Sequence, residues 1–244
     1  MNITETSIIG EVVASDYHTA AVLKNHKIDF CCNGNRTIAD VCLEKGLDPI
    51  ILIDQLEEST KINHASKQDF NSWSLDFLAD YIVNQHHHYV EQKIQEIKPY
   101  LSKIVQVHGS QHPELLSVQQ LFEETSDELT RHMKKEEFIL FPFIRKMVRA
   151  QDNRETLASP IFDSVQNPIA MMHHEHDAEG KRFRKIAALT QDYTPPNDAC
   201  NTYKVTLAML KEFEEDLHLH IHLENNILFP KSIELEEQLR DNKN

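Results

Sequence analysis

Apolar residues recur at steps of three and four along much of the chain, a pattern that predicts amphipathic helices. Two of these apolar stripes are unusual, because each contains a His and, one turn later, a Glu. The first consists of Leu115, Val118, Phe122, Thr125, Leu129, His132, Glu136, Ile139 and Phe143. The second consists of Tyr203, Thr206, Leu210, Phe213, Leu217, His220, Glu224 and Ile227. Such stripes lie in the core of a helical bundle. An unpaired carboxylate there costs several kcal/mol, so the pattern indicates cations or a polar network inside the bundle.

Four long helical segments are predicted between residue 74 and the end of the chain. Proline is expected to bend or interrupt three of them, at Pro99, Pro142 and Pro230. The loops 108–112 and 191–196 are short enough to join antiparallel neighbours. The segments cover residues 74–107, 113–149, 159–190 and 197–239. The sequence therefore predicts an all-α fold, with an up-down-up-down four-helix bundle over residues 74–244.

Residues 1–58 are predicted to form a separate, small helical domain. Its first helix is indicated by a cluster of aliphatic residues at positions 8–13. Later helices are expected to begin near Ser15, at Thr37 with Asp40, and at Asp48-Pro49. Residues 59–73 are polar and without period, so we expect a linker there.

Charge and targeting signals narrow the classes of function. The formal charge of -14 at pH 7 argues against a nucleic-acid partner, because the phosphates would be repelled. The first residues lack the basic segment and apolar run of a secretory signal, and no apolar stretch of about 20 residues is present to span a bilayer. We therefore expect a cytoplasmic protein without a membrane partner.

The chain has four cysteines, at positions 31, 32, 42 and 200. Their spacing fits neither a zinc pattern nor a disulfide framework, which favours reduced thiols. Cys31 and Cys32 precede Asn33 and Gly34 in a predicted turn, so both thiols are expected near the surface. They have two interpretations. They are either small apolar side chains that fill a gap, or reactive thiols of lowered pKa that serve redox chemistry or docking.

An eleven-residue motif occurs twice in the chain. Residues 132–142 read HMKKEEFILFP and residues 220–230 read HIHLENNILFP, with identity at six positions. Each copy places its His and Glu four residues apart, which on an α-helix is about 6 Å along the axis and one turn around it. Both side chains therefore leave the same face of the helix and reach one metal site.

The first predicted helix of the bundle contains three consecutive histidines, at positions 86–88. Ile82 lies one turn before His86, whereas the neighbours of His88 are polar. We therefore expect His86 to point into the bundle and His88 to face water. His87 stays open as an alternative.

The third predicted helix contains histidines at positions 173, 174 and 176. His176 continues an apolar stripe that begins with Ile169 and Met172, and His173 stays open as an alternative. The predicted metal ligands are His86, His132, Glu136, His176, His220 and Glu224.

These residue types also indicate the class of metal. Four neutral imidazoles and two carboxylates suit iron or manganese better than metals that prefer thiolates. If each Glu bridges two ions and an oxo or hydroxo group joins them, each ion has five ligands and one open coordination position. The predicted site is therefore a two-metal centre that can bind a small molecule or release its metal.

Taken together, these residues resemble the repair-of-iron-centres family, also called the ScdA/YtfE type. The matching stretches are Asp29-Phe30-Cys31-Cys32, His132 with Glu136 before Ile139-Leu140-Phe141-Pro142, Glu175-His176-Asp177, and His220 with Glu224 before Asn225-Asn226-Ile227-Leu228-Phe229-Pro230. The resemblance covers essentially the whole chain. It implies a small N-terminal domain with a Cys pair, then a hemerythrin-like bundle in which the same six ligands hold two non-haem iron ions with an oxo or hydroxo bridge.

The resemblance also implies a function in the response to nitrosative and oxidative stress. Such proteins repair damaged iron-sulfur clusters, and donation of iron from the two-iron centre would account for the repair. The implied partners are proteins with damaged clusters, with nitric oxide or oxygen as small ligands. Two alternatives use the same centre: a nitric oxide reductase, and a sensor of nitric oxide or oxygen. Monomer and homodimer both remain open.

Overall fold

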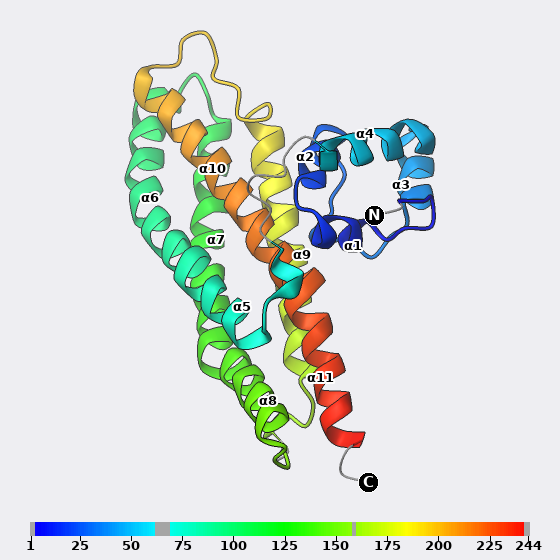
Figure 1. Cartoon of the computed structure of the whole chain (residues 1–244). Coiled ribbons are helices and arrows are strands. Elements are labelled where there is room, and N and C mark those ends of the chain that lie inside the picture. The colour runs from blue at the N-terminus through cyan, green and yellow to red at the C-terminus, as the bar shows by residue number, and fades with distance from the viewer. Residues whose placement is uncertain (1–2, 62–68, 158–159, 242–244) are drawn as a thin grey trace.

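The structure is a computed structural model that describes residues 3–61, 69–157 and 160–241. Long helices form an elongated bundle, and the short N-terminal helices lie beside it (Figure 1). The chain runs alternately up and down through the bundle, which confirms the predicted all-α, hemerythrin-like architecture. Among the described residues, no helix has both the length and the apolarity that a bilayer crossing requires.

Each of three bundle columns consists of two α-helices joined by a short π-helical segment, and the remaining column is one helix. The first column is α5 (Leu75–Tyr81), η2 (Ile82–His87) and α6 (His88–His108). The second is α7 (Glu114–Lys135), η3 (Glu136–Leu140) and α8 (Phe141–Asn153). The third is α9 (Gln166–Leu189), and the fourth is α10 (Asn201–Leu223), η4 (Glu224–Leu228) and α11 (Phe229–Asp241).

The third column begins later than the sequence predicted. Helix α9 starts at Gln166 rather than near Pro160, because a turn at Asp163, with φ of 68°, and Ser164 precedes it. Ser159, the other residue of the predicted start, lies outside the described residues.

The short N-terminal helices are α1 (Ile9–Ser15), α2 (Thr19–Asn25), α3 (Ile38–Lys45) and α4 (Pro49–Lys61), and a 3₁₀ turn, η1 (Phe70–Ser72), precedes the bundle. The predicted start at Thr37 is confirmed, because Thr37 and Asp40 form a reciprocal capping box. Ser15 does not cap α2, whose N-cap is His18; the Ser15 hydroxyl instead donates to the carbonyl of Val12. Of the predicted linker, residues 62–68 lie outside the described residues.

The π-helical segments place wide turns in three columns of the bundle. In two of them a proline follows, Pro142 after η3 and Pro230 after η4, each six residues beyond a Glu. Proline has no N–H to continue the α-helical ladder, which suits a wide turn just before it. Side chains five residues apart share a face there, so Glu136 and Phe141 are both buried. Ile139, which the sequence placed in the apolar stripe, is instead 48% exposed.

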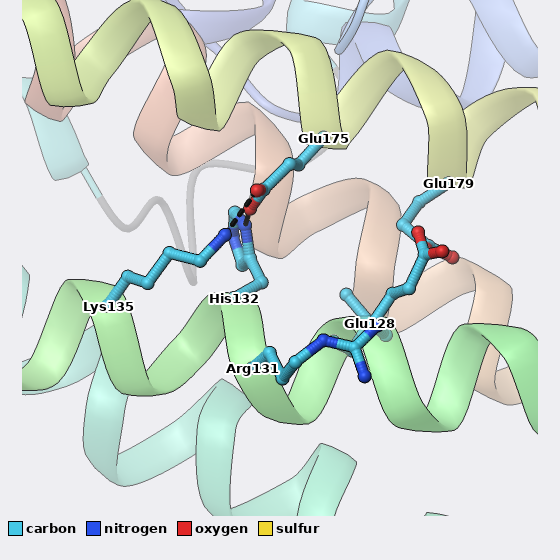
Figure 2. A pocket seen from close by; sticks show the side chains of 7 residues that line it. Glu128, Arg131, His132, Lys135, Glu175 and Glu179 are labelled. Atoms are coloured by element: carbon cyan, nitrogen blue, oxygen red, sulfur yellow. Dashed lines mark hydrogen bonds and ion pairs between the residues drawn. The ribbon is translucent and has the colours of Figure 1, made fainter.

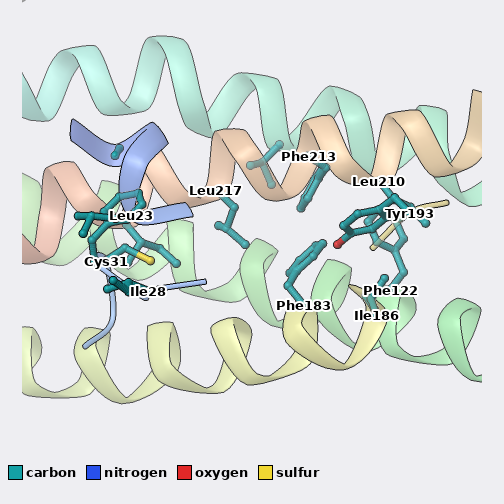
Figure 3. Close-up of a cluster of buried hydrophobic side chains, with 14 of the residues drawn as sticks. Leu23, Ile28, Cys31, Phe122, Phe183, Ile186, Tyr193, Leu210, Phe213 and Leu217 are labelled. Carbon is teal, nitrogen blue, oxygen red and sulfur yellow. The ribbon is translucent and has the colours of Figure 1, made fainter. Parts of the chain in front are cut away.

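The buried apolar side chains form two clusters along the bundle. The first includes Phe122, Phe183 and Phe213 and continues into the N-terminal helices through Leu23 and Cys31 (Figure 3). The second lies around α5, α8 and α11 and includes Leu78, Ile144 and Phe229. In every column at least one buried histidine lies between segments that belong to the two clusters: His87, His132, His176 and His220. A polar layer therefore divides the interior of the bundle.

The N-terminal helices contact the bundle closely at Asn226. Its side-chain nitrogen donates to the carbonyl of Phe30 at 3.1 Å. Gly10 packs against the same amide: a Cβ atom at Gly10 would lie 2.4 Å from the Asn226 Oδ1 atom. Glycine at position 10 therefore permits the close approach of α1 to η4.

We predict that Gly10→Ala destabilises the protein by about 1–3 kcal/mol, because the added methyl group forces Asn226 away from Phe30. An unhindered Gly→Ala change in a helix has the opposite sign, and stabilises by about 0.4–1 kcal/mol. Chemical denaturation of Gly10→Ala, Asn226→Ala and the double variant measures the effect. The double variant should be more stable than the sum of the two single changes predicts; a more stable Gly10→Ala variant would contradict the close packing.

Candidate metal centre

The buried polar layer brings together five of the six ligands that the sequence predicted, with a different sixth. Glu136 Oε2 lies 3.3 Å from His132 Nε2 and 3.4 Å from His87 Nε2. Glu224 has its Oε1 atom 3.0 Å from His220 Nε2 and its Oε2 atom 3.2 Å from His176 Nε2. All six side chains are buried. Each column of the bundle thus contributes a histidine, and the two columns with the repeated motif also contribute a glutamate.

The six side chains form two groups with metal-ligand spacing, and both glutamates belong to both groups. Within each group the donor atoms lie within 4.8 Å of one another. The groups are His87, Glu136, His220 and Glu224, and His132, Glu136, His176 and Glu224. Two shared carboxylates would allow each glutamate to contact a cation in either group.

His86 lies outside both groups, and the structure gives its predicted place to His87. The reason is the π-helical segment Ile82–His87. An α-helical spacing of four would align His86 with Ile82, but a π turn aligns residues five apart, here Ile82 with His87. The Nδ1 atom of His86 instead lies 3.0 Å from Asp216 Oδ1, and its ring stacks on that of His220.

His173 also lies outside both groups. Its ring packs edge-on against Phe229, with 5.6 Å between the ring centroids. The histidine of α9 that reaches the polar layer is therefore His176, as the sequence predicted.

Several buried polar atoms of the layer are suited to bind cations, because they do not form hydrogen bonds with one another. Within the part of the chain that the structure describes, both carboxylate oxygens of Glu136, Oε2 of Glu224 and Nε2 of His87 have no hydrogen-bond partner. Buried polar atoms without partners are costly, and a bound ion removes that cost by taking them as ligands. The donor set fits two cations.

The arrangement of His132 and His176 also indicates that a cation binds in this layer. His132 Nδ1 lies 2.9 Å from Glu175 Oε2, and His176 Nδ1 lies 2.8 Å from Asn225 Oδ1. Each Nδ1 must donate, because its partner oxygen accepts. In the neutral rings both Nε2 atoms then carry lone pairs, and these atoms are only 3.0 Å apart. A cation between the two nitrogens resolves the repulsion.

Hydrogen bonds from outside the groups fix three of the four imidazoles. Besides Glu175 and Asn225, Glu137 holds His87, with 3.0 Å between Oε1 and Nδ1. Such contacts orient metal-binding histidines and raise their basicity. The sequence analysis missed these three residues. Their position in the sequence could have indicated them, because each is directly adjacent to a residue of the two groups.

The charges of the layer depend on one another. Burial alone would raise the pKa of Glu136, and nearby Glu224 raises it further, but the imidazoles of His132 and His87 lower it overall. Burial alone would lower the pKa of His132, yet Glu136, Glu175 and Glu224 raise it to about 10. Without a metal the carboxylates therefore favour protons on the imidazoles of His132 and His87, and cations would replace those protons.

A cavity of about 250 Å³ reaches the layer between α7 and α9. Figure 2 shows His132 and Glu175 in its wall, with Lys135 contacting the same Glu175 carboxylate. The hydrogen bond from His132, with help from Lys135, lowers the pKa of Glu175 to about 2. The cavity gives small molecules or ions a path to the His132 side of the layer.

The Cys pair lies against the same layer. Asn225 connects them: its oxygen accepts from His176, and its nitrogen donates to the carbonyl of Cys31 at 3.0 Å. Cys31 is only 4% exposed, so the expected surface position is wrong for this thiol. Of the two interpretations of the pair, the one with a lowered pKa does not hold for Cys31. The hydrogen bond with Cys32, burial and the nearby Asp29 raise the pKa of Cys31 well above its usual value.

Comparison with known proteins agrees with this architecture. Residues 78–232 match the model of the hemerythrin HHE cation binding domain, and residues 5–60 match the ScdA_N model, which describes a domain of unknown function. An iron-sulfur cluster repair protein ScdA from Staphylococcus haemolyticus is 31% identical over 231 residues, covering 94% of this chain and 99% of the relative.

A second relative, an iron-sulfur cluster repair protein YtfE from Yersinia pseudotuberculosis, is 32% identical over 225 residues, covering 92% of this chain and 96% of the relative. These matches confirm the resemblance found in the sequence. The chain belongs to the ScdA/YtfE family, in which an ScdA-type N-terminal region precedes a hemerythrin-type cation-binding domain.

Proposed function

We propose that this protein repairs damaged iron-sulfur clusters by donating iron from a two-iron centre. The proposal rests on the two groups of metal-binding side chains described above. Each group consists of two His and two Glu, and Glu136 and Glu224 belong to both groups. The relatives are named iron-sulfur cluster repair proteins, which supports the same function here.

The donor atoms favour iron and allow its release. Imidazole nitrogen and carboxylate oxygen suit iron, and no thiolate is present in either group to favour softer metals. Each group supplies four side chains, fewer than the six positions of an octahedral ion. The ions would therefore be held by an incomplete protein shell, and a client cluster that lacks an iron could compete for them.

The protein's own side chains have distinct tasks in this proposal. Glu136 and Glu224 supply the negative charge that retains cations, and the four histidines supply neutral donors. Glu137, Glu175 and Asn225 keep the imidazoles oriented. When bound, iron would supply both the repair material and a redox-active centre. The partners would be proteins with damaged clusters.

We predict that Glu136→Leu and Glu224→Leu each abolish iron loading and repair. Either change removes a carboxylate from both groups, so iron measured after purification should fall from about two ions per chain to well under one. Repair is measured as recovered activity of a cluster enzyme that has been damaged with nitric oxide.

Glu212→Leu is the matched control, because Glu212 lies on the exposed face of α10, the helix that leads to Glu224. It should keep both iron and repair activity. If an iron-free Glu136→Leu protein repaired the cluster enzyme as well as the natural protein, donation from this centre would be wrong.

We predict that His87→Ala lowers iron content and His86→Ala does not. His87 belongs to a group that includes both glutamates, whereas His86 contacts Asp216. Loss of one nitrogen donor should weaken retention at least about tenfold. Iron retained during dialysis against a chelator distinguishes the two variants. The opposite ranking would show that α-helical rather than π-helical alignment holds in the iron-loaded protein.

Nitric oxide reduction is a second candidate function, favoured by the cavity that reaches His132. Two nitric oxide molecules, two electrons and two protons give one nitrous oxide and one water. We predict that the reduced, iron-loaded protein donates iron only when a damaged cluster is present. Nitrous oxide released over several turnovers with an excess of chemical reductant and without any client protein, measured by gas chromatography, would favour the reductase instead.

A further inference from the structure

A second cluster of metal-binding side chains lies in the loop between α2 and α3. It consists of Asp29, Cys31 and Cys32, whose donor atoms lie within 4.8 Å of one another. The two sulfur atoms are 3.8 Å apart, and Cys31 Sγ is 3.4 Å from Asp29 Oδ1. Cys32 Sγ is also 3.4 Å from the backbone carbonyl oxygen of His176, on α9. Two sulfur atoms and two oxygen atoms thus lie in consecutive close contact.

These three separations match three of the six edges of a tetrahedral site. Metal–sulfur bonds of about 2.3 Å place two sulfurs about 3.8 Å apart at a tetrahedral ion, and a metal–oxygen bond of about 2.1 Å gives sulfur–oxygen edges of about 3.6 Å. The separation of the two Cys sulfurs equals the first value, and both sulfur–oxygen distances are close to the second. These three pairs of atoms therefore already have the spacing of ligands at one ion.

We propose that Cys31 and Cys32, with Asp29 and the carbonyl oxygen of His176, form a second cation site for a borderline-soft divalent ion such as Zn²⁺ or Fe²⁺. Two thiolates and two oxygens are the ligands of that class. The site differs from the His/Glu centre in donor chemistry, and it does not depend on the function of that centre.

The loop is held in the required shape by its hydrogen bonds. Asp29 Oδ1 accepts from the backbone N–H groups of Cys31 and Cys32, at 3.2 and 3.0 Å. The other oxygen of Asp29 accepts from Arg184 at 2.9 Å, which ties the loop to α9. The sulfur atoms are therefore positioned before an ion arrives.

Gly180 leaves the room that Cys32 needs. A Cβ atom at this position of α9 would lie 3.1 Å from Cys32 Sγ, closer than ordinary van der Waals contact. Glycine in the interior of a helix costs about 1 kcal/mol relative to alanine. The need for space beside the Cys32 sulfur atom therefore explains why a glycine occupies this position of α9.

Binding replaces protons with the ion. In the free loop the Cys31 thiol donates to Asp29 and the Cys32 thiol donates to the His176 carbonyl. A divalent ion bound by two thiolates displaces both thiol protons, and the two oxygen acceptors become ligands. Because the ion must displace these protons, the affinity for the ion should rise with pH.

Titration with Cd²⁺ tests the site, since cadmium–thiolate bonds absorb in the ultraviolet. The reduced, iron-loaded protein should gain this absorption with an endpoint of one Cd²⁺ per chain. Cys32→Ser should lose about half of the absorption and bind at least about tenfold more weakly. Cys200→Ser, which removes an exposed thiol elsewhere, should match the natural protein.

Gly180→Ala provides a variant that keeps all four donors and favours the helix. It should bind Cd²⁺ more weakly than the natural protein while its iron content and melting temperature are maintained. X-ray absorption at the cadmium edge should count two sulfur neighbours in the natural protein. One sulfur neighbour, or absorption that is lost in Cys200→Ser and kept in Cys32→Ser, would overturn the proposal whether or not the protein repairs clusters.

Discussion

Two carboxylates buried in the middle of a helical bundle require positive charge beside them, and much of the structure follows from this requirement. Glu136 and Glu224 are inaccessible to water, so their charge must be offset by protonated imidazoles or by cations. Four histidines, one from each column, surround them. Outer contacts such as Glu175 and Asn225 matter because they decide where each imidazole places its free nitrogen. The two apolar clusters then enclose this polar layer from either end.

Amphipathic periodicity in the sequence was sufficient to predict the helices of the bundle and most of the polar layer. His132, Glu136, His220 and Glu224 were found because each His–Glu pair lies within an α-helical turn and in phase with the preceding stripe. On the first column the sequence preferred His86 and left His87 open, and it is His87 that lies in the groups, because a periodicity of 3.6 cannot reveal a π turn. Glu175, which orients His132, has no pattern of its own, since its role depends on a neighbouring helix.

The N-terminal region and the bundle meet at the centre rather than at a remote surface. One amide, Asn225, contacts both His176 and the backbone of Cys31. Its neighbour Asn226 contacts the backbone of Phe30. The position of the Cys loop could not be predicted from a turn signal, because Asn and Gly describe the local backbone and not what packs over it. Any displacement of this loop must therefore alter a hydrogen bond to an imidazole of the centre.

The wide turns also have a consequence for insertions and deletions in the chain. Each π-helical segment contains one residue more than the α-helix would need over the same length. Loss of a single residue between Ile82 and His87 would thus leave a continuous and fully hydrogen-bonded α-helix. Ile82 and His87 would then be four residues apart, a spacing that an α-helix also places on one face. Such a chain would keep the buried faces on both sides of the deletion, whereas the same loss within α6 would rotate the residues before it by about 100°.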